Sequence, residues 1–179
     1  MSHFMSRLLA FVAIAGALLI GGLGITMVPA STAVAQETDN PSGLAVPRYA
    51  TIGRSRVNMR QGPSTSHRIL WVYAGQEGLP VEVVAETELW RQIRDPEGDI
   101  GWVHHALLSN ERGAVVQGSM RPLRRQPAAD AATMAYLEPR VVASLNECSE
   151  DWCQISVDNY TGWVRHDEVW GVYPAEVVR

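Results

Sequence analysis

The stretch LWRQI at Leu89–Ile93, followed by GWVH at Gly101–His104, has a counterpart later in the same chain. That counterpart reads DWCQI at Asp151–Ile155 and GWVR at Gly162–Arg165, so the tryptophans recur after 62 and 61 positions. A period of about 60 residues with tryptophan in register indicates two homologous units. Gly, Pro and Asp residues separate the short apolar runs, a pattern typical of a small β-barrel or β-sandwich. We therefore predict an all-β protein with two tandem units, each the size of a minimal barrel.

The segment that opens the first unit points to a known family. Val57–Ser64 reads VNMRQGPS and resembles the opening signature of bacterial SH3 (SH3b) domains, while Trp90 and the GWV triplet stand where that family has two further strands. The resemblance extends over residues 48–174. Over this range the chain is similar to exported tandem SH3-like proteins of alphaproteobacterial type. The second unit departs from it at Arg121-Pro122 and at Gln126. The resemblance implies two tandem SH3-like β-barrels and a ligand among cell-wall peptides.

Residues 1–35 have the composition of a signal peptide. Arg7 precedes an apolar stretch over residues 8–25, and small residues lead up to Ala35. We place the cleavage between Ala35 and Gln36, which predicts a periplasmic or secreted product with no stable membrane anchor. An uncleaved anchor is the alternative, because 18 apolar residues could just span a bilayer.

The remaining boundaries follow from composition and from the repeat. Polar and turn-forming residues fill the segment before the first unit, which predicts a disordered linker. The expected organisation is a signal peptide at 1–35, a linker at 36–47, a first SH3-like domain at 48–112, a connector at 113–118 and a second SH3-like domain at 119–174.

The charge balance excludes some classes of function. The chain carries 15 Lys+Arg and 19 Asp+Glu, a net charge of −4, which becomes −5 once Arg7 is removed with the leader. A nucleic-acid binder that neutralises phosphates would not be built this way. Every basic residue is arginine, so Schiff-base lysine chemistry and a P-loop lysine are excluded.

No segment carries a recognisable catalytic or metal-binding motif, so we expect no enzyme, no cofactor and no metal site. The acids of the loop Asp95–Asp99 superficially suggest calcium, but Ala106 stands where an EF-hand loop needs its final acid. We therefore interpret that loop as a solvated turn and not as a calcium site.

Cys148 and Cys153 flank a short polar turn between two β-type runs. In an oxidising compartment two neighbouring cysteines usually pair, so we predict a disulfide across a hairpin. The alternative is a Cys/His cell-wall hydrolase in which His166 activates one of the two thiols.

The aromatic residues are too many to lie wholly within two small cores, which leaves some of them for a binding surface. We expect Trp102 and Trp163 in the cores and Trp90 and Trp152 at a groove edge. An aromatic shelf flanked by Arg60, Arg91 and Arg94 would suit an extended peptide or glycan that carries carboxylates. The predicted ligand-binding residues are Trp71, Tyr73, Trp90, Arg60, Arg91 and Trp152.

Two hypotheses for the function lead. In the first, the protein is a non-catalytic periplasmic binding or adaptor protein that recognises a peptidoglycan stem peptide or an envelope protein. In the second, it is a purely protein–protein structural or regulatory factor of the cell envelope. The hydrolase is the third and weakest alternative.

Overall fold

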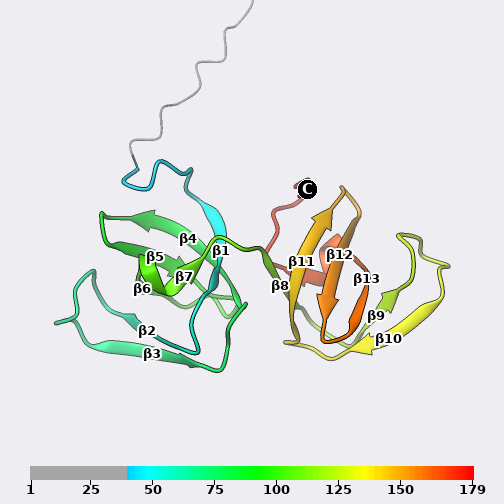
Figure 1. Cartoon of the computed structure of the whole chain (residues 1–179), viewed down its shortest axis with the longest axis horizontal. Coiled ribbons are helices and arrows are strands. Elements are labelled where there is room, and N and C mark those ends of the chain that lie inside the picture. Colours follow the sequence, from blue (N-terminus) through cyan, green and yellow to red (C-terminus); the bar gives the residue numbers. More distant parts are fainter. Residues whose placement is uncertain (1–39) are drawn as a thin grey trace, which may run out of the picture. The chain divides into compact units, whose positions relative to one another are not determined.

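The computed structural model describes residues 40–179, which form two seven-stranded antiparallel sheets (Figure 1). The first sheet has the order β3-β2-β6-β5-β4-β1-β7 and the second the order β10-β9-β13-β12-β11-β8-β14. The strands of the first sheet are β1 (Arg48–Ile52), β2 (Arg56–Arg60), β3 (Ile69–Ala74), β4 (Pro80–Glu86), β5 (Trp90–Arg94), β6 (Ile100–His104) and β7 (Leu108–Ser109). Those of the second are β8 (Gly113–Val116), β9 (Arg121–Arg124), β10 (Thr133–Leu137), β11 (Val142–Cys148), β12 (Trp152–Val157), β13 (Tyr160–Arg165) and β14 (Val169–Trp170).

The helical content of the described residues is two short 3₁₀ turns, η1 (His105–Leu107) and η2 (His166–Glu168), at equivalent places in the two repeats. Within residues 40–179 no helix is long and apolar enough to cross a membrane. The predicted all-β fold with two tandem units is confirmed. Each sheet has seven strands, and two of these, β7 and β14, are only two residues long.

The two repeats use the same strand register. Gln92 pairs with Trp102 in the first sheet as Gln154 pairs with Trp163 in the second, and Ile93 and Ile155 face Gly101 and Gly162 in the same way. The isoleucines are fully buried in their respective cores. The repeat that the sequence predicts is therefore a structural repeat, residue by residue, over the paired strands.

The glycine of each GWV triplet is required by close packing. A β-carbon at Gly101 would lie 2.5 Å from Cγ of Met59 and 2.9 Å from the carbonyl oxygen of Arg60. At Gly162 it would lie 2.8 Å from Cγ of Leu123 and close to the next carbonyl in the same way. Only glycine lets the neighbouring strand approach this closely.

Two segments differ from their expected roles. Residues 40–47 are not a loose tether, because the Ser42 hydroxyl donates to Glu86 Oε1 over 2.5 Å and Val46 packs on the first core. Residues 113–118 are not a mere connector, because they contain β8, all four residues of which are buried. β8 pairs with β11 and β14 and so belongs to the second sheet. The predicted leader and its predicted cleavage site, between Ala35 and Gln36, lie outside the described residues.

The predicted disulfide between Cys148 and Cys153 is present. The two residues face each other across β11 and β12, with Cα atoms 4.1 Å apart. Since both sulfur atoms are consumed in this bond, neither is a thiolate nucleophile. This contradicts the Cys/His hydrolase alternative.

An aromatic cluster joins the two repeats. The Tyr49 ring of β1 meets the edge of Trp170 at 4.9 Å and lies 4.7 Å from Tyr173, measured between ring centroids. The Tyr173 hydroxyl donates a hydrogen bond to Glu82 Oε1 of β4 over 3.1 Å. Burial, and next the charge of Glu82, raise the pKa of Tyr49 to about 12. The pKa of Tyr173 is also raised, so this hydroxyl stays protonated and keeps its hydrogen bond at physiological pH.

Two carboxylates make the stability depend on pH. Burial alone would raise the pKa of Glu176, but hydrogen bonds from Arg112 and from the Tyr173 backbone N–H outweigh it and hold the pKa below the ordinary 4.5. The pKa of Glu86 is lowered against burial in the same way, by Ser42 and Arg48. A carboxylate whose pKa is lower in the folded state than in the unfolded state stabilises the fold at every pH above its unfolded-state pKa. This contribution is lost as the pH falls through the folded-state pKa.

We therefore expect the free energy of unfolding to be constant near neutral pH and to fall as the pH drops below 4.5. Urea denaturation between pH 3 and pH 7 measures this. Glu176→Gln should flatten part of the acid limb, whereas Glu88→Gln, at an exposed position, should leave it unchanged. A wild-type profile that is flat down to pH 3 would contradict the prediction.

Candidate binding site

The structure separates the two aromatic residues that β3 contributes to the predicted shelf. Trp71 is 55% exposed, whereas Tyr73 is 1% exposed and belongs to the first core. Trp71 pairs with Met59 and Tyr73 with Val57, next to an irregularity in the register. β3 is an edge strand, and its first three residues are all exposed. The exposed aromatic surface of this strand is therefore Trp71 alone.

The expectation that Trp90 and Trp152 stand exposed at a groove edge is wrong, because each is 8% exposed. Trp90 meets the edge of the His104 ring at 5.4 Å between centroids. The guanidinium groups of Arg124 and Arg165 lie 5.6 and 5.4 Å from the Trp152 ring and cover it.

The expected core position of Trp102 and Trp163 is also wrong, because both are half-buried. Val103 and Val164, the next residues along each strand, are fully buried and fill the cores instead. Since successive side chains of a strand point to opposite faces, an inward valine turns the preceding tryptophan outward.

The arginines expected to attract ligand carboxylates bind within the chain. Arg91 is buried and pairs with Glu86 through its Nε at 2.8 Å, so it is not part of an open groove. Arg94 pairs with Glu82 at 2.6 Å. Arg60 donates to the carbonyls of Thr65 and His67 over 2.9 and 2.8 Å and is half-buried. A ligand-binding role for Arg60 and for Trp71 stays a prediction.

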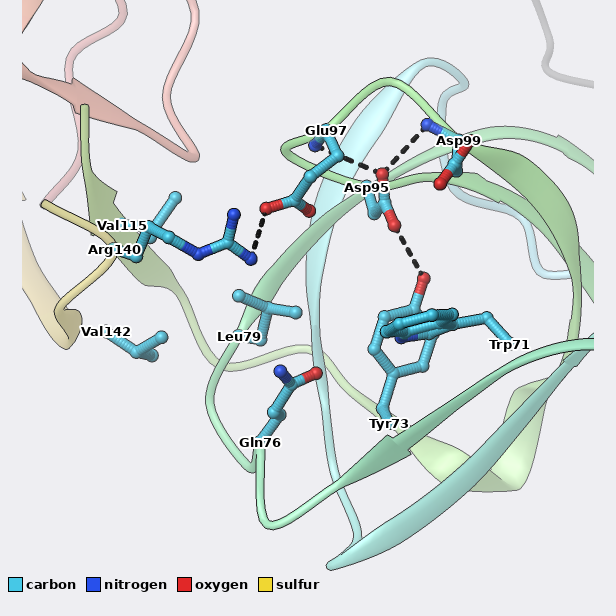
Figure 2. Close-up of a pocket in the computed structure, with 10 residues that line it drawn as sticks. All are labelled: Trp71, Tyr73, Gln76, Leu79, Asp95, Glu97, Asp99, Val115, Arg140 and Val142. Carbon is cyan, nitrogen blue, oxygen red and sulfur yellow. Dashed lines mark hydrogen bonds and ion pairs between the residues drawn. The ribbon is translucent and has the colours of Figure 1, made fainter. Parts of the chain in front are cut away.

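A cleft of about 330 Å³ lies beside Trp71. Figure 2 shows its aromatic wall, its acidic loop and the side chains of the second repeat that reach it. The lining residues are Trp71, Tyr73, Gln76, Leu79, Asp95, Glu97, Asp99, Val115, Arg140 and Val142.

Asp95 holds the acidic loop in place. Its buried carboxylate accepts hydrogen bonds from the backbone N–H groups of Glu97 and Asp99 over 3.1 and 2.9 Å, and from the Tyr73 hydroxyl over 3.1 Å (Figure 2). Burial, and next the charge of Asp95, raise the pKa of Tyr73 well above its ordinary value, so this hydroxyl remains a donor. The loop is thus fixed from below by a buried pair, and Glu97 and Asp99 are presented at the surface.

The second repeat contributes one charge to the cleft. Arg140 Nη2 lies 2.6 Å from Glu97 Oε1, and Figure 2 shows this side chain extending toward the acidic loop. Arg140 has a φ of 70°, a left-handed backbone conformation that is uncommon for a residue with a β-carbon. Val142 of the same repeat packs against the first core.

Only the first repeat carries this arrangement of side chains. In the second sheet, Leu123 pairs with Ala135 as Met59 pairs with Trp71, so alanine takes the place of the exposed tryptophan. By the same alignment, Leu137 corresponds to Tyr73 and Val157 corresponds to Asp95. The repeats share a fold, and they differ in the residues that line this cleft.

The sequence pattern predicted only a solvated turn at Asp95–Asp99. It did not predict that the acids of this loop line the cleft. The available signal was the tyrosine–aspartate pair that the first repeat has and the second lacks. Within residues 40–179 no group of three His, Cys, Asp or Glu side chains is arranged to hold a metal ion.

The comparison with protein families agrees with the two-unit fold. A family model described as "Bacterial SH3 domain" matches residues 53–110 and again 117–171. The chain therefore belongs to the bacterial SH3 domain family and contains two tandem copies of the domain.

Comparisons with individual proteins add little to this. No curated protein matches the chain. A solved structure of NlpC2 from Trichomonas vaginalis is similar at 10% identity with a TM-score of 0.32, covering 71% of this chain and 49% of that one. NlpC1 from the same organism is similar at 10% identity and a TM-score of 0.32, covering 70% of this chain and 46% of that one. The chain thus spans about half the length of these two proteins.

Proposed function

We propose that the protein is a non-catalytic binding or adaptor module of the cell envelope that recognises a peptidoglycan stem peptide. Two tandem bacterial SH3 domains and a disulfide support this, because a disulfide suits an oxidising compartment outside the cytosol. The leader expected over residues 1–35 would deliver the protein to the periplasm.

One observation carries the proposal. Trp71 is a large aromatic side chain that is more than half exposed on the wall of a cleft. Buried aromatic anchors dominate the free energy of binding at interfaces, so an exposed tryptophan in a concave site is a natural anchor. The other tryptophan proposed for the first repeat, Trp90, is buried and has a structural role.

Replacing Trp71 with alanine should therefore weaken the binding of the protein to purified peptidoglycan sacculi. The expected loss is about 1–3 kcal/mol, measured by co-sedimentation over a range of sacculus concentrations. The fold should be retained, because the side chain is outside the core.

Tyr136→Ala is the matched control for this experiment. Tyr136 is an aromatic residue of similar exposure on β10 of the second repeat. Its replacement should leave sacculus binding unchanged. Equal losses in both variants would place the anchor elsewhere, and a wild-type protein that stays in the supernatant would contradict the proposed function.

The edge strand β3 supports a second candidate, in which the partner is an envelope protein. Ile69, Leu70 and Trp71 are three consecutive exposed apolar residues on a strand whose outer edge is unpaired in the sheet order. An extended segment of another protein can add to such an edge by backbone hydrogen bonds. Retention of a defined envelope protein, without retention of sacculi, would favour this candidate.

A further inference from the structure

We propose that the cleft beside Trp71 binds a primary ammonium group of a peptide ligand. The inference rests on the proposed function and names the ligand chemistry of its site. The lining contains three carboxylates, Asp95, Glu97 and Asp99, against one guanidinium, Arg140, which leaves two negative charges. A cleft whose net charge is negative attracts positively charged ligands. This is the reverse of the carboxylate recognition that the arginine content of the chain suggested.

The three carboxylates are not equivalent. Asp95 is buried and occupied by three hydrogen bonds from its own loop and from Tyr73. Glu97 pairs with Arg140, but both side chains are well exposed, so this ion pair is weak and easily exchanged. The Asp99 carboxylate has no hydrogen-bond or ion-pair partner among residues 40–179. Asp99 is therefore the carboxylate available to a ligand.

A second, independent acceptor in the same cleft has no donor. The side-chain oxygen Oε1 of Gln76 is buried, lines the cleft and has no hydrogen-bond partner. Buried polar atoms in folded proteins are almost always paired, so this oxygen is left for a donor from outside the chain, a water molecule or a ligand. Gln76 is uncharged and lies on a different loop from the acids, so this observation does not depend on them.

The aromatic wall completes the chemistry. An ammonium group has three N–H donors and no acceptor, and its charge is attracted to the face of a tryptophan ring. Asp99 and the Trp71 ring therefore offer a carboxylate and a π face in one cleft, and Gln76 offers an amide oxygen at the other end of the same cleft (Figure 2). Because alanine and valine stand at the positions of Trp71 and Asp95 in the second repeat, that repeat lacks such a site, and the two described repeats share one.

The test compares two synthetic peptides that differ in one amine. The first is N-acetyl-alanyl-γ-D-glutamyl-lysine, and the second is the same peptide with the lysine Nε also acetylated. Binding to the full mature protein is followed by NMR at the Trp71 indole N–H. We expect the acetylated peptide to bind about tenfold more weakly, the size expected for a charge-assisted hydrogen bond. Added salt should weaken only the binding of the free amine.

Asp99→Asn makes the test specific to the cleft. It removes the charge and keeps the backbone N–H that donates to Asp95, so the loop is retained. The variant should lose most of the preference for the free amine, whereas Glu88→Gln, at an exposed acid outside the cleft lining, should keep it. Equal affinity of the wild type for the two peptides, or a preference that survives Asp99→Asn, overturns the inference.

The outcome can be separated from that of the proposed function. Retention on sacculi without a preference for the free amine would leave the wall target in place and reject the ammonium site. A preference for the free amine without retention on sacculi would support the ammonium site and reject the wall target.

Discussion

Replacing Glu86 with alanine should lower the free energy of unfolding by about 3–5 kcal/mol, the usual cost of leaving a buried charge without its partner. The Glu86 side chain is fully buried and pairs with Arg91 Nε at 2.8 Å and with Arg48 Nη2 at 3.0 Å. It also accepts from the Ser42 hydroxyl. Its loss leaves the buried guanidinium of Arg91 without a counter-charge and frees the segment before β1.

Urea denaturation of the wild type and of the Glu86→Ala variant at pH 7 measures this effect. Glu88→Ala is the matched control, because Glu88 is an exposed residue of the turn that follows β4. That variant should stay within about 0.5 kcal/mol of the wild type. Similar stabilities of the Glu86→Ala variant and the wild type would mean that Arg91 finds solvent or another partner without cost.

The second large effect is expected at Gly171, where the two repeats pack together. Its φ is +119°, and an added β-carbon would overlap the carbonyl oxygen of Gly113 and lie 3.1 Å from Cβ of Pro80. Alanine in left-handed backbone costs about 1–2 kcal/mol. Overpacking against neighbours that cannot move away adds about 1–3 kcal/mol. We expect Gly171→Ala to be destabilised by both effects in thermal or urea denaturation.

Gly98→Ala separates these two contributions. Gly98 has a φ of +92°, and a β-carbon there would meet nothing within 4 Å. This variant should show only the backbone cost, so the difference between the two variants isolates the overlap with Gly113. Equal destabilisation of the Gly171→Ala and Gly98→Ala variants would show that the atoms around Gly171 move to accommodate a β-carbon at no cost in free energy.

Local patterns in the sequence were enough to predict the repeat, the β class and the disulfide. The tryptophans in register mark equivalent strand pairs, and the observed register is the same in both repeats at Gln92 and Gln154. Cys148 and Cys153 could be paired from sequence because a five-residue separation across a turn brings them face to face on adjacent strands. These features depend on residues close together in the chain or repeated along it.

The candidate site could not be predicted in the same way. The alternation of side chains along a strand separates its two faces, but it does not say which face the curved sheet buries. The sequence therefore predicted an exposed Trp90 and a buried Trp102, whereas Trp90 is buried and Trp102 is half-buried. The arginine content suggested an anionic ligand, but Arg91 and Arg94 are matched with acids on the neighbouring strand β4.

The amino-acid sequence by itself determined that this protein is built from two bacterial SH3 domains with one disulfide, because these properties follow from spacing and from residue type. Tertiary structure alone decided where the cleft lies and what charge it carries. Trp71, Asp99 and Arg140 line one cleft although three separate segments carry them. Their meeting depends on how the strands curve and on how the second repeat approaches the first, and neither is encoded in any short stretch of the chain.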